Sequence, residues 1–234
     1  MNTLVTPHGV SASLGRCAGQ AARYALLAIV VALTGCAAQK RTYDYTAFRS
    51  SKPASILVLP PLNDSPDLRA SYSVMSTVTA PLAESGYYVF PLAVVDDTFK
   101  ENGLEHPGEM HQAPLAKLRE IFGADAVLYL TVKQYGTVYQ VIDSTTVVAV
   151  AARLVDIRTG ALLWEGRASA SDAEGRQNSG GGLVGLLVTA LVRQVVGSVG
   201  DPGHPISAIT NARLLHAQPG GLLYGPRSPS YEKD

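Results

Sequence analysis

Apolar and polar positions alternate along the first half of the chain in the manner of strands separated by helices. Continuous apolar runs of strand length are typical of strands covered on both faces, and they occur at Ser55–Leu59, Tyr87–Leu92 and Ala126–Tyr135. The stretches between them predict helices over about 68–85, 94–102 and 114–122, with a polar loop at 105–112. Because Pro81 interrupts the first helix, we expect it to kink the helix or to split off its last turn.

The pattern changes after Tyr135 to one that is typical of an antiparallel meander. Short turn sequences separate its expected strands, which are Val138–Ile142, Thr145–Asp156 and Ala161–Ala170. Two helices follow, at Leu183–Val199 and Pro205–His216. The fold class predicted from this order is α/β. It has a mixed sheet with an N-terminal β-α-β portion, the antiparallel meander and C-terminal helices.

The helix predicted at Leu183–Val199 is apolar on most of its sides, so most of its surface should be buried. It is too short, and too interrupted by Arg193 and Gln194, to span a bilayer. One interpretation is a central core helix; the other, which we favour, is burial between protomers or against a partner. The candidate interface residues are Leu183, Leu186, Leu187, Ala190, Leu191 and Val195.

The amino-terminal pattern indicates export. Arg16 and Arg23 precede an apolar run of 15 residues, Tyr24–Ala38, and no acidic residue precedes the expected cleavage site. A span needs about 20 residues, so a secretory signal is favoured over a transmembrane helix. Gly35 and Cys36 lie at the expected cleavage point and resemble the lipobox of bacterial lipoproteins. The resemblance implies cleavage before Cys36, diacylation of its thiol and acylation of the new amino terminus.

Four segments follow from these patterns. They are a lipoprotein signal peptide (1–35), a lipidated tether (36–53), one α/β domain (54–218) and an irregular tail (219–234). Part of the tether is expected to pack, because Tyr43, Tyr45 and Phe48 are costly to leave in water. Whether the tail folds back on the domain stays open, as does the true start of translation.

Composition excludes several classes of function. Removal of residues 1–35 leaves 17 basic and 19 acidic residues, a net charge of −2, which gives no reason to expect nucleic-acid binding. Cys17 leaves with the leader, so Cys36 is the single cysteine of the mature chain, and neither an intrachain disulfide nor a cysteine metal site is expected.

No catalytic constellation stands out in the sequence. Asp96 and Asp97 point about 100° apart on a helix and do not form an acid/base pair, and the run Asn63–Asp67 lacks the length of a calcium loop. Capping and turn roles are the better interpretation of both. No two histidines have the spacing of zinc ligands, and the glycines of Gly180–Gly185 lack the context of a phosphate loop. We therefore predict no enzyme activity, no cofactor and no metal.

Several motifs together resemble a family of uncharacterised Gram-negative outer-membrane lipoproteins, a domain of unknown function. They include Tyr43–Phe48, Lys52–Asn63, Leu118–Asp125, Leu154–Gly160, Leu163–Gly166, Asn178–Gly185 and Leu222–Pro229. The resemblance implies a fold similar to the amino-terminal domain of TolB and to curli-secretion lipoproteins. It also implies assistance to envelope transport or assembly, as a homodimer, without known catalytic residues.

These observations lead to two hypotheses of function. The first is a non-enzymatic lipoprotein that docks other envelope proteins and lies at the outer membrane, facing the periplasm. Ala37 supports this location, because aspartate after the lipidated cysteine is what favours inner-membrane retention in lipoproteins generally. The alternative is a carrier that binds a small or lipidic ligand in a pocket between the sheet and the apolar helix.

Overall fold

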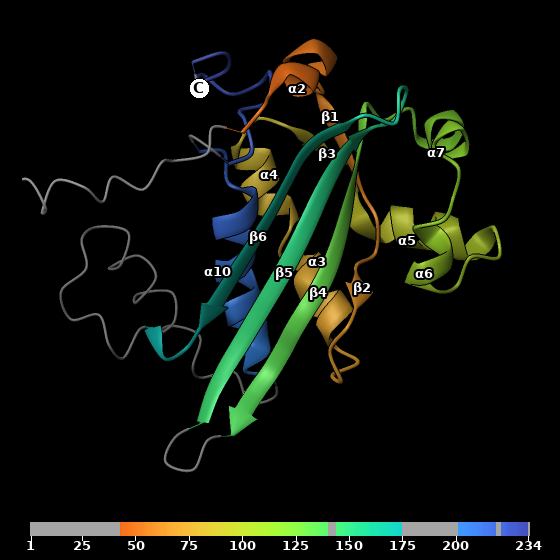
Figure 1. The fold of residues 1–234 in the computed structure, drawn as a ribbon. Helices are drawn as coiled ribbons and strands as arrows, with labels where there is room; N and C mark the ends of the chain where they lie inside the picture. The colour runs from red at the N-terminus through yellow and green to blue at the C-terminus, as the bar shows by residue number, and fades with distance from the viewer. Residues whose placement is uncertain (1–42, 140–143, 175–200, 219–220, 234) are drawn as a thin grey trace, which may run out of the picture. The chain divides into compact units, whose positions relative to one another are not determined.

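The computed structural model describes residues 43–139, 144–174, 201–218 and 221–233, which contain one mixed sheet of the order β3-β1-β4-β5-β6 (Figure 1). Strand β2 pairs with β4 beside this path. The strands are β1 (Ser55–Val58), β2 (Leu62–Asn63), β3 (Tyr88–Val89), β4 (Ala126–Tyr139), β5 (Ser144–Asp156) and β6 (Leu162–Ser171). Pairing is parallel among β1, β3 and β4 and antiparallel from β4 to β6, so the predicted fold class is confirmed.

Helices cover both faces of the sheet at β1 but only one face at β5. The helices are α2 (Thr46–Ser51), α3 (Ala70–Ser76), α4 (Thr79–Glu84), α5 (Leu92–Glu101), α6 (Pro107–Met110), α7 (Leu115–Phe122) and α10 (Gly203–Leu215). Helices α3, α4 and α10 lie together behind the sheet in the view of Figure 1, and α5–α7 lie at its parallel end, near β1 and β3.

Alternation along β1 builds two hydrophobic clusters. Ile56 and Val58 point toward α3, α4 and α10, where the larger cluster continues through Val148, Val150 and Leu154 of β5. Leu57 and Leu59 point the other way and pack with a smaller cluster from α5–α7, made by Val95, Phe99, Met110 and Leu118. The continuous apolar run of the sequence therefore marks a strand buried on both faces, as predicted.

The expected helix at 68–85 is broken into α3 and α4 at Thr77 and Val78. Pro81 has no N–H to donate to the carbonyl of Thr77, so the helical ladder fails four residues before the proline. Asn211 of α10 donates to the carbonyl of Val74 at 2.8 Å and to the Thr77 hydroxyl at 2.8 Å, and so satisfies groups that the break frees.

Three elements differ from the sequence-based expectation. Residues 126–139 form one strand, β4, where two strands, at 126–135 and 138–142, were expected, and a bulge between Val132 and Gln134 absorbs the irregularity. Residues 140–142 lie outside the described residues. Strand β3 is only two residues long, because Pro91 removes a donor and the chain enters α5 at Leu92. The expected polar loop at 105–112 contains α6, whose Met110 is buried against the smaller cluster.

The segment predicted as a tether contains α2, and its aromatic residues pack as expected. Phe48 is buried in the larger cluster, and Tyr45 lies 4.9 Å from the ring of Tyr43 and 6.4 Å from that of Phe48. The tail also folds back, since Leu222 and Leu223 are buried in the same cluster. Both segments lie at one end of the sheet (Figure 1).

The tail contacts the main chain around Gly86 too closely for side chains. A Cβ atom on Gly225 would lie 2.6 Å from the carbonyl oxygen of Gly86, whereas one on Gly108 would meet nothing within 4 Å. We expect Gly225→Ala to lower the free energy of unfolding by about 1–3 kcal/mol, through overpacking that displaces the tail. Urea unfolding checks this, with Gly108→Ala as the control; equal effects of the two substitutions would contradict the contact.

Asp156, at the end of β5, connects the β5–β6 turn with α2. Its Oδ1 accepts hydrogen bonds from the backbone N–H groups of Arg158 and Thr159, at 2.9 and 2.7 Å, and from the Thr159 hydroxyl at 2.9 Å. Its Oδ2 accepts from the Ser51 hydroxyl at 2.5 Å. Burial alone would raise the pKa of Asp156, but these donors outweigh it and hold the pKa below its ordinary value.

Candidate docking surface

The face of β4–β6 turned away from α3, α4 and α10 is the largest open part of the sheet, and we name it the outer sheet face. Figure 1 looks onto it, and among the described residues no helix crosses its middle. On β5 it presents Thr145, Val147, Ala149, Ala151 and Arg153, which alternate with buried residues that face the core. Small apolar side chains thus occupy a place where a solvent-facing strand normally carries polar ones.

Polar side chains border this apolar stripe on both sides. Ala149 is paired with Gln134 of β4 and Ser169 of β6, and Ala151 is paired with Thr131 and Arg167. At the β4 margin Lys133 pairs with Asp64 at 2.8 Å. An apolar centre within a polar rim is the usual composition of a surface that binds another protein.

The free edge of β6 is closed by side chains rather than left open. Arg213 of α10 donates to the carbonyl of Ser169 at 2.8 Å, and the N–H of Ser171 donates to Glu174 at 3.1 Å. The backbone of Glu165 is hydrogen-bonded to the Tyr43 side chain. These contacts protect the edge from pairing with another strand, so docking by the face is favoured over docking by the edge.

A groove of about 520 Å³ lies at the α6 end of the outer sheet face. Tyr129, Arg153 and His111 line it. Burial lowers the pKa of His111 and outweighs the opposing effect of a 2.9 Å hydrogen bond between Nε2 and the Pro60 carbonyl. Burial likewise raises the pKa of Tyr129. Both side chains are therefore neutral at physiological pH, and the charged side chains that line the groove are those of Arg153 and Lys133.

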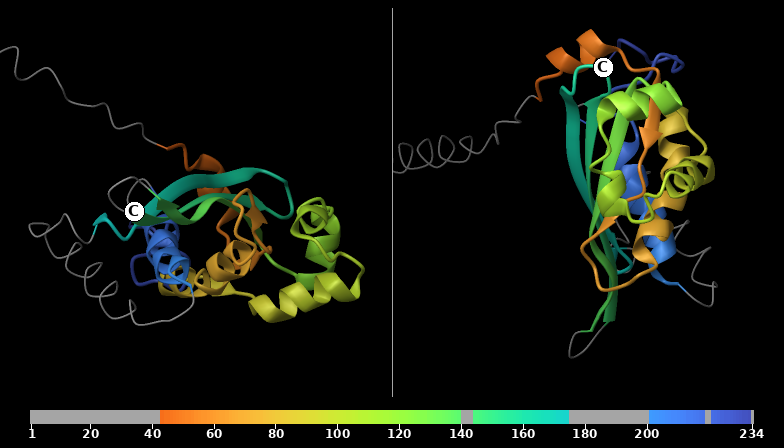
Figure 2. Two further views of the ribbon diagram at one scale, coloured as in Figure 1. Left: turned by 90° about the horizontal axis from the view of Figure 1, so that it is seen from below. Right: turned by 90° about the vertical axis from the view of Figure 1, so that its right-hand side faces the viewer.

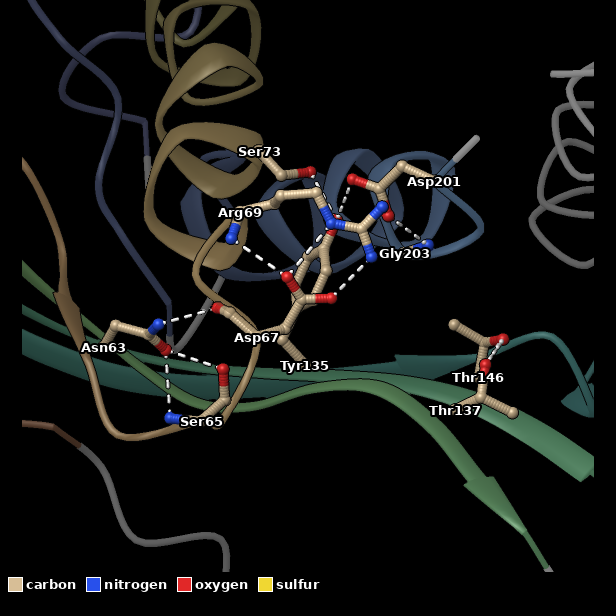
Figure 3. Close-up of polar contacts among 10 residues, drawn as sticks. All are labelled: Asn63, Ser65, Asp67, Arg69, Ser73, Tyr135, Thr137, Thr146, Asp201 and Gly203. Atoms are coloured by element: carbon tan, nitrogen blue, oxygen red, sulfur yellow. Dashed lines mark hydrogen bonds and ion pairs between the residues drawn. The ribbon is translucent and has the colours of Figure 1, made fainter. Parts of the chain in front are cut away.

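A cluster of hydrogen-bonded polar side chains at the start of α10 has a structural role (Figure 3). Asp201 accepts the N–H of Gly203 at 3.0 Å and the hydroxyl of Tyr135 at 2.6 Å. Tyr135 lies 2.8 Å from Ser73 Oγ, which lies 3.1 Å from Nδ1 of His204. Because Ser73 lies within α3 and is buried, the Ser73–His204 pair does not present a nucleophile to a substrate.

The predicted turn role of the polar run before α3 is confirmed by its hydrogen bonds, whereas the N-cap residue of α3, Arg69, makes no side-chain capping bond. Asn63 accepts from the N–H of Ser65 at 2.9 Å and donates to the carbonyl of Asp67 at 2.8 Å. The Asp67 carboxylate accepts from the N–H of Arg69 at 2.9 Å and pairs with its guanidinium at 2.7 Å. These bonds, shown in Figure 3, lock the loop between β2 and α3.

Within the described ranges, no group of three or more His, Cys, Asp or Glu side chains could hold a metal ion. Asp96 instead pairs with Lys100 one helical turn away, at 2.6 Å. Of the helices that the structure describes, none has the length and hydropathy needed to cross a membrane.

The site residues predicted from the sequence lie outside the described residues. These are the cleavage and lipidation positions Gly35 and Cys36 and the candidate interface Leu183, Leu186, Leu187, Ala190, Leu191 and Val195. Their roles stay predictions. The outer sheet face was not predicted from the sequence, because Thr145–Asp156 is a nearly continuous apolar run whose two faces carry similar side chains.

Comparison with known proteins shows extensive similarity to one group of lipoproteins. The family model described as "Putative lipoprotein GNA1162-like" matches residues 43–227. The "Putative lipoprotein NMB1124/NMB1162" of Neisseria meningitidis serogroup B is 52% identical over 203 residues, which cover 86% of this chain and 94% of that protein.

Solved structures show the same similarity. The crystal structure of lipoprotein GNA1162 from Neisseria meningitidis is 51% identical and has a TM-score of 0.50, covering 62% of this chain and 100% of that chain. The LpoB C-terminal domain from Escherichia coli is 18% identical, with a TM-score of 0.37 over 51% of this chain and 84% of that domain. The latter similarity is too low to carry a functional argument.

Proposed function

Because this chain belongs to the GNA1162-like family of lipoproteins, we propose that it is a non-enzymatic accessory protein that docks other envelope proteins. The family that the sequence motifs indicated is confirmed by this membership. Membership of this family makes the chain a lipoprotein, and hence a protein anchored to a membrane of the cell envelope. The proposal goes further and assigns the anchor to Cys36, the location to the periplasmic side of the outer membrane, and the oligomeric state to a homodimer.

The observation that carries the docking role is the outer sheet face. Val147, Ala149 and Ala151 form a small apolar stripe on β5, the middle one of three long strands, and polar residues of β4 and β6 border it. Close approach of a partner is possible because these side chains are short, and the rigid sheet beneath them holds the surface flat and preorganised. The closed β6 edge directs the partner to the face.

Two features support the absence of catalysis in this proposal. The Ser73–His204 pair is engaged by Tyr135 within the fold, and Asp201 accepts hydrogen bonds from the Tyr135 hydroxyl and from the N–H of Gly203. The alternative function, a ligand carrier, places its pocket beside residues 183–199, which lie outside the described residues. It stays a prediction, and docking is the function that the described geometry favours.

We expect Ala149→Glu with Ala151→Glu to abolish the complexes that this lipoprotein forms in mild-detergent extracts of membranes. Two buried carboxylates at the centre of an interface are each costly, whereas in the isolated fold both positions are only partly buried, on a face that no described helix covers. Stability should therefore change by only about 0.5 kcal/mol. Native electrophoresis with detection of this protein measures the size of the complexes.

Ala93→Glu is the matched control, because Ala93 is exposed on α5 and lies away from the outer sheet face. The control should leave the complexes at their original size. Complexes that survive the double substitution in a folded protein would contradict docking by this face, and an equal loss in the control would show a non-specific charge effect.

A further inference from the structure

We propose that the pocket between α2 and the C-terminal tail binds the phosphate-bearing head group of an anionic phospholipid in the membrane that holds the anchor. The pocket has a volume of about 290 Å³ and lies wholly within the described residues. Phe48, Pro53 and Leu223 give it apolar walls, and Arg49 and Lys52 bring two cations to it. We name it the tail pocket.

Chain length brings this pocket close to a bilayer. The described chain begins at Tyr43, seven residues after Cys36. Seven residues reach at most about 25 Å when fully extended. Helix α2 begins three residues after Tyr43, at Thr46, and supplies one wall of the pocket, and the tail supplies the other. If Cys36 carries lipid, as the proposed function requires, the tail pocket is therefore held within reach of phospholipid head groups.

Charge and aromatic composition at this end of the molecule fit an anionic lipid surface. Residues 43–52 and 221–234 contain four basic and three acidic residues, a net charge of +1, although the chain after the leader carries −2 overall. The basic residues are Arg49, Lys52, Arg227 and Lys233. Tyr224 and Tyr231 also line the pocket, and tyrosine is enriched where membrane and water meet. Anionic leaflets attract such basic segments.

Backbone geometry also singles out this pocket. In the part of the chain that the structure describes, Lys52 (φ 48°) and Glu232 (φ 60°) are the two non-glycine residues with left-handed backbone. Both line the tail pocket, and their side chains pair at 2.8 Å. Such conformations are unfavourable for residues with a Cβ atom, and at Lys52 the left-handed backbone is the C-cap that ends α2. Here they bring an ammonium group to the pocket mouth.

The Lys52–Glu232 pair is the contact that a lipid phosphate would replace. Both side chains are more than half exposed, so their mutual attraction is weakened by water and salt. The Glu232 carboxylate raises the pKa of Lys52, which keeps the ammonium charged. A phosphate held by both Arg49 and Lys52 would have two cationic partners.

Hydrogen–deuterium exchange of the acylated mature protein in vesicles tests this assignment. Amide exchange in residues 46–52 and 224–232 is expected to slow several-fold when neutral phosphatidylcholine vesicles are given a fraction of anionic phosphatidylglycerol. Arg49→Gln with Lys52→Gln should remove this protection. Lys117→Gln with Arg119→Gln, the same loss of charge on exposed α7, should retain it.

Three results would overturn the assignment. They are equal exchange of the native protein in the two kinds of vesicle, equal loss of protection in both double variants, and equal protection by inorganic phosphate added to neutral vesicles. The last would identify a site for free phosphate instead of lipid. Slow exchange at Ser55–Leu59 reports that each variant is folded. Flotation with neutral vesicles reports the anchor by itself, so a failure of the proposed anchoring is distinguishable from a failure of the pocket.

Discussion

Replacing Cys36 with serine is expected to abolish incorporation of radiolabelled palmitate and to leave the leader uncleaved. Serine has no thiol for the acyl-bearing diglyceride, and the cleavage implied by the lipobox resemblance follows that modification. Each acyl chain contributes about 0.8 kcal/mol per buried methylene, and stable anchoring takes two chains. Loss of every chain should therefore release the protein from membranes in fractionation, since the remaining apolar run of 15 residues is too short to span.

Cys17→Ser provides a matched control for this experiment. It makes the same chemical change at the other cysteine, which is expected to leave with residues 1–35. Palmitate labelling and membrane fractionation should be unchanged in this variant. If Cys36→Ser still labelled with palmitate, or still fractionated with membranes to the same extent, Cys36 would not be the anchor.

Asp156→Ala is expected to lower the free energy of unfolding by about 3–5 kcal/mol. The substitution leaves two backbone N–H groups and two hydroxyls without their carboxylate acceptor, and such hydrogen bonds to a charged group contribute about 1.5–3 kcal/mol each without being additive. The β5–β6 turn and the end of α2 would both loosen. Chemical denaturation measures the change, and Asp97→Ala on exposed α5 is the control. Equal effects of the two changes would contradict the structural role.

The Asp156 carboxylate also makes the free energy of unfolding depend on pH, in a direction that its pKa determines. The folded pKa of Asp156 lies below its ordinary value, so the unfolded chain takes up this proton first as pH falls. The stabilisation is fully present above the ordinary pKa, near 4, and is lost as pH falls through the folded pKa. Asp156→Asn should remove this contribution and flatten the loss of stability below about pH 4. An unchanged acid profile would contradict it.

Local patterns were sufficient to predict most elements of the fold. The apolar run at 55–59, the proline in the helix at 68–85 and the short turn after Asp156 each specify one local outcome, and the structure has all three. Where the prediction failed, a tertiary contact determined the local structure. The β4 bulge and the burial of Met110 in α6 depend on strands and helices distant in sequence, which no local period encodes.

The candidate surfaces were harder to predict for the same reason. Val147, Ala149 and Ala151 lie in a nearly continuous apolar run, and only the position of α10 decides which face of that run is covered. The tail pocket brings together Lys52 and Glu232, which are 180 residues apart. Gly35, Cys36 and residues 183–195 were predicted from local pattern alone, and they lie outside the described residues.

Photocross-linking from the outer sheet face in intact cells tests the docking account most directly. A photoreactive amino acid at position 149 of the lipid-anchored protein should give a discrete adduct with an envelope protein or with a second copy of this chain. The same amino acid at position 93, exposed on α5, should give none. Absence of any adduct from positions 147, 149 and 151, with the protein folded and at the membrane, would contradict docking by this face.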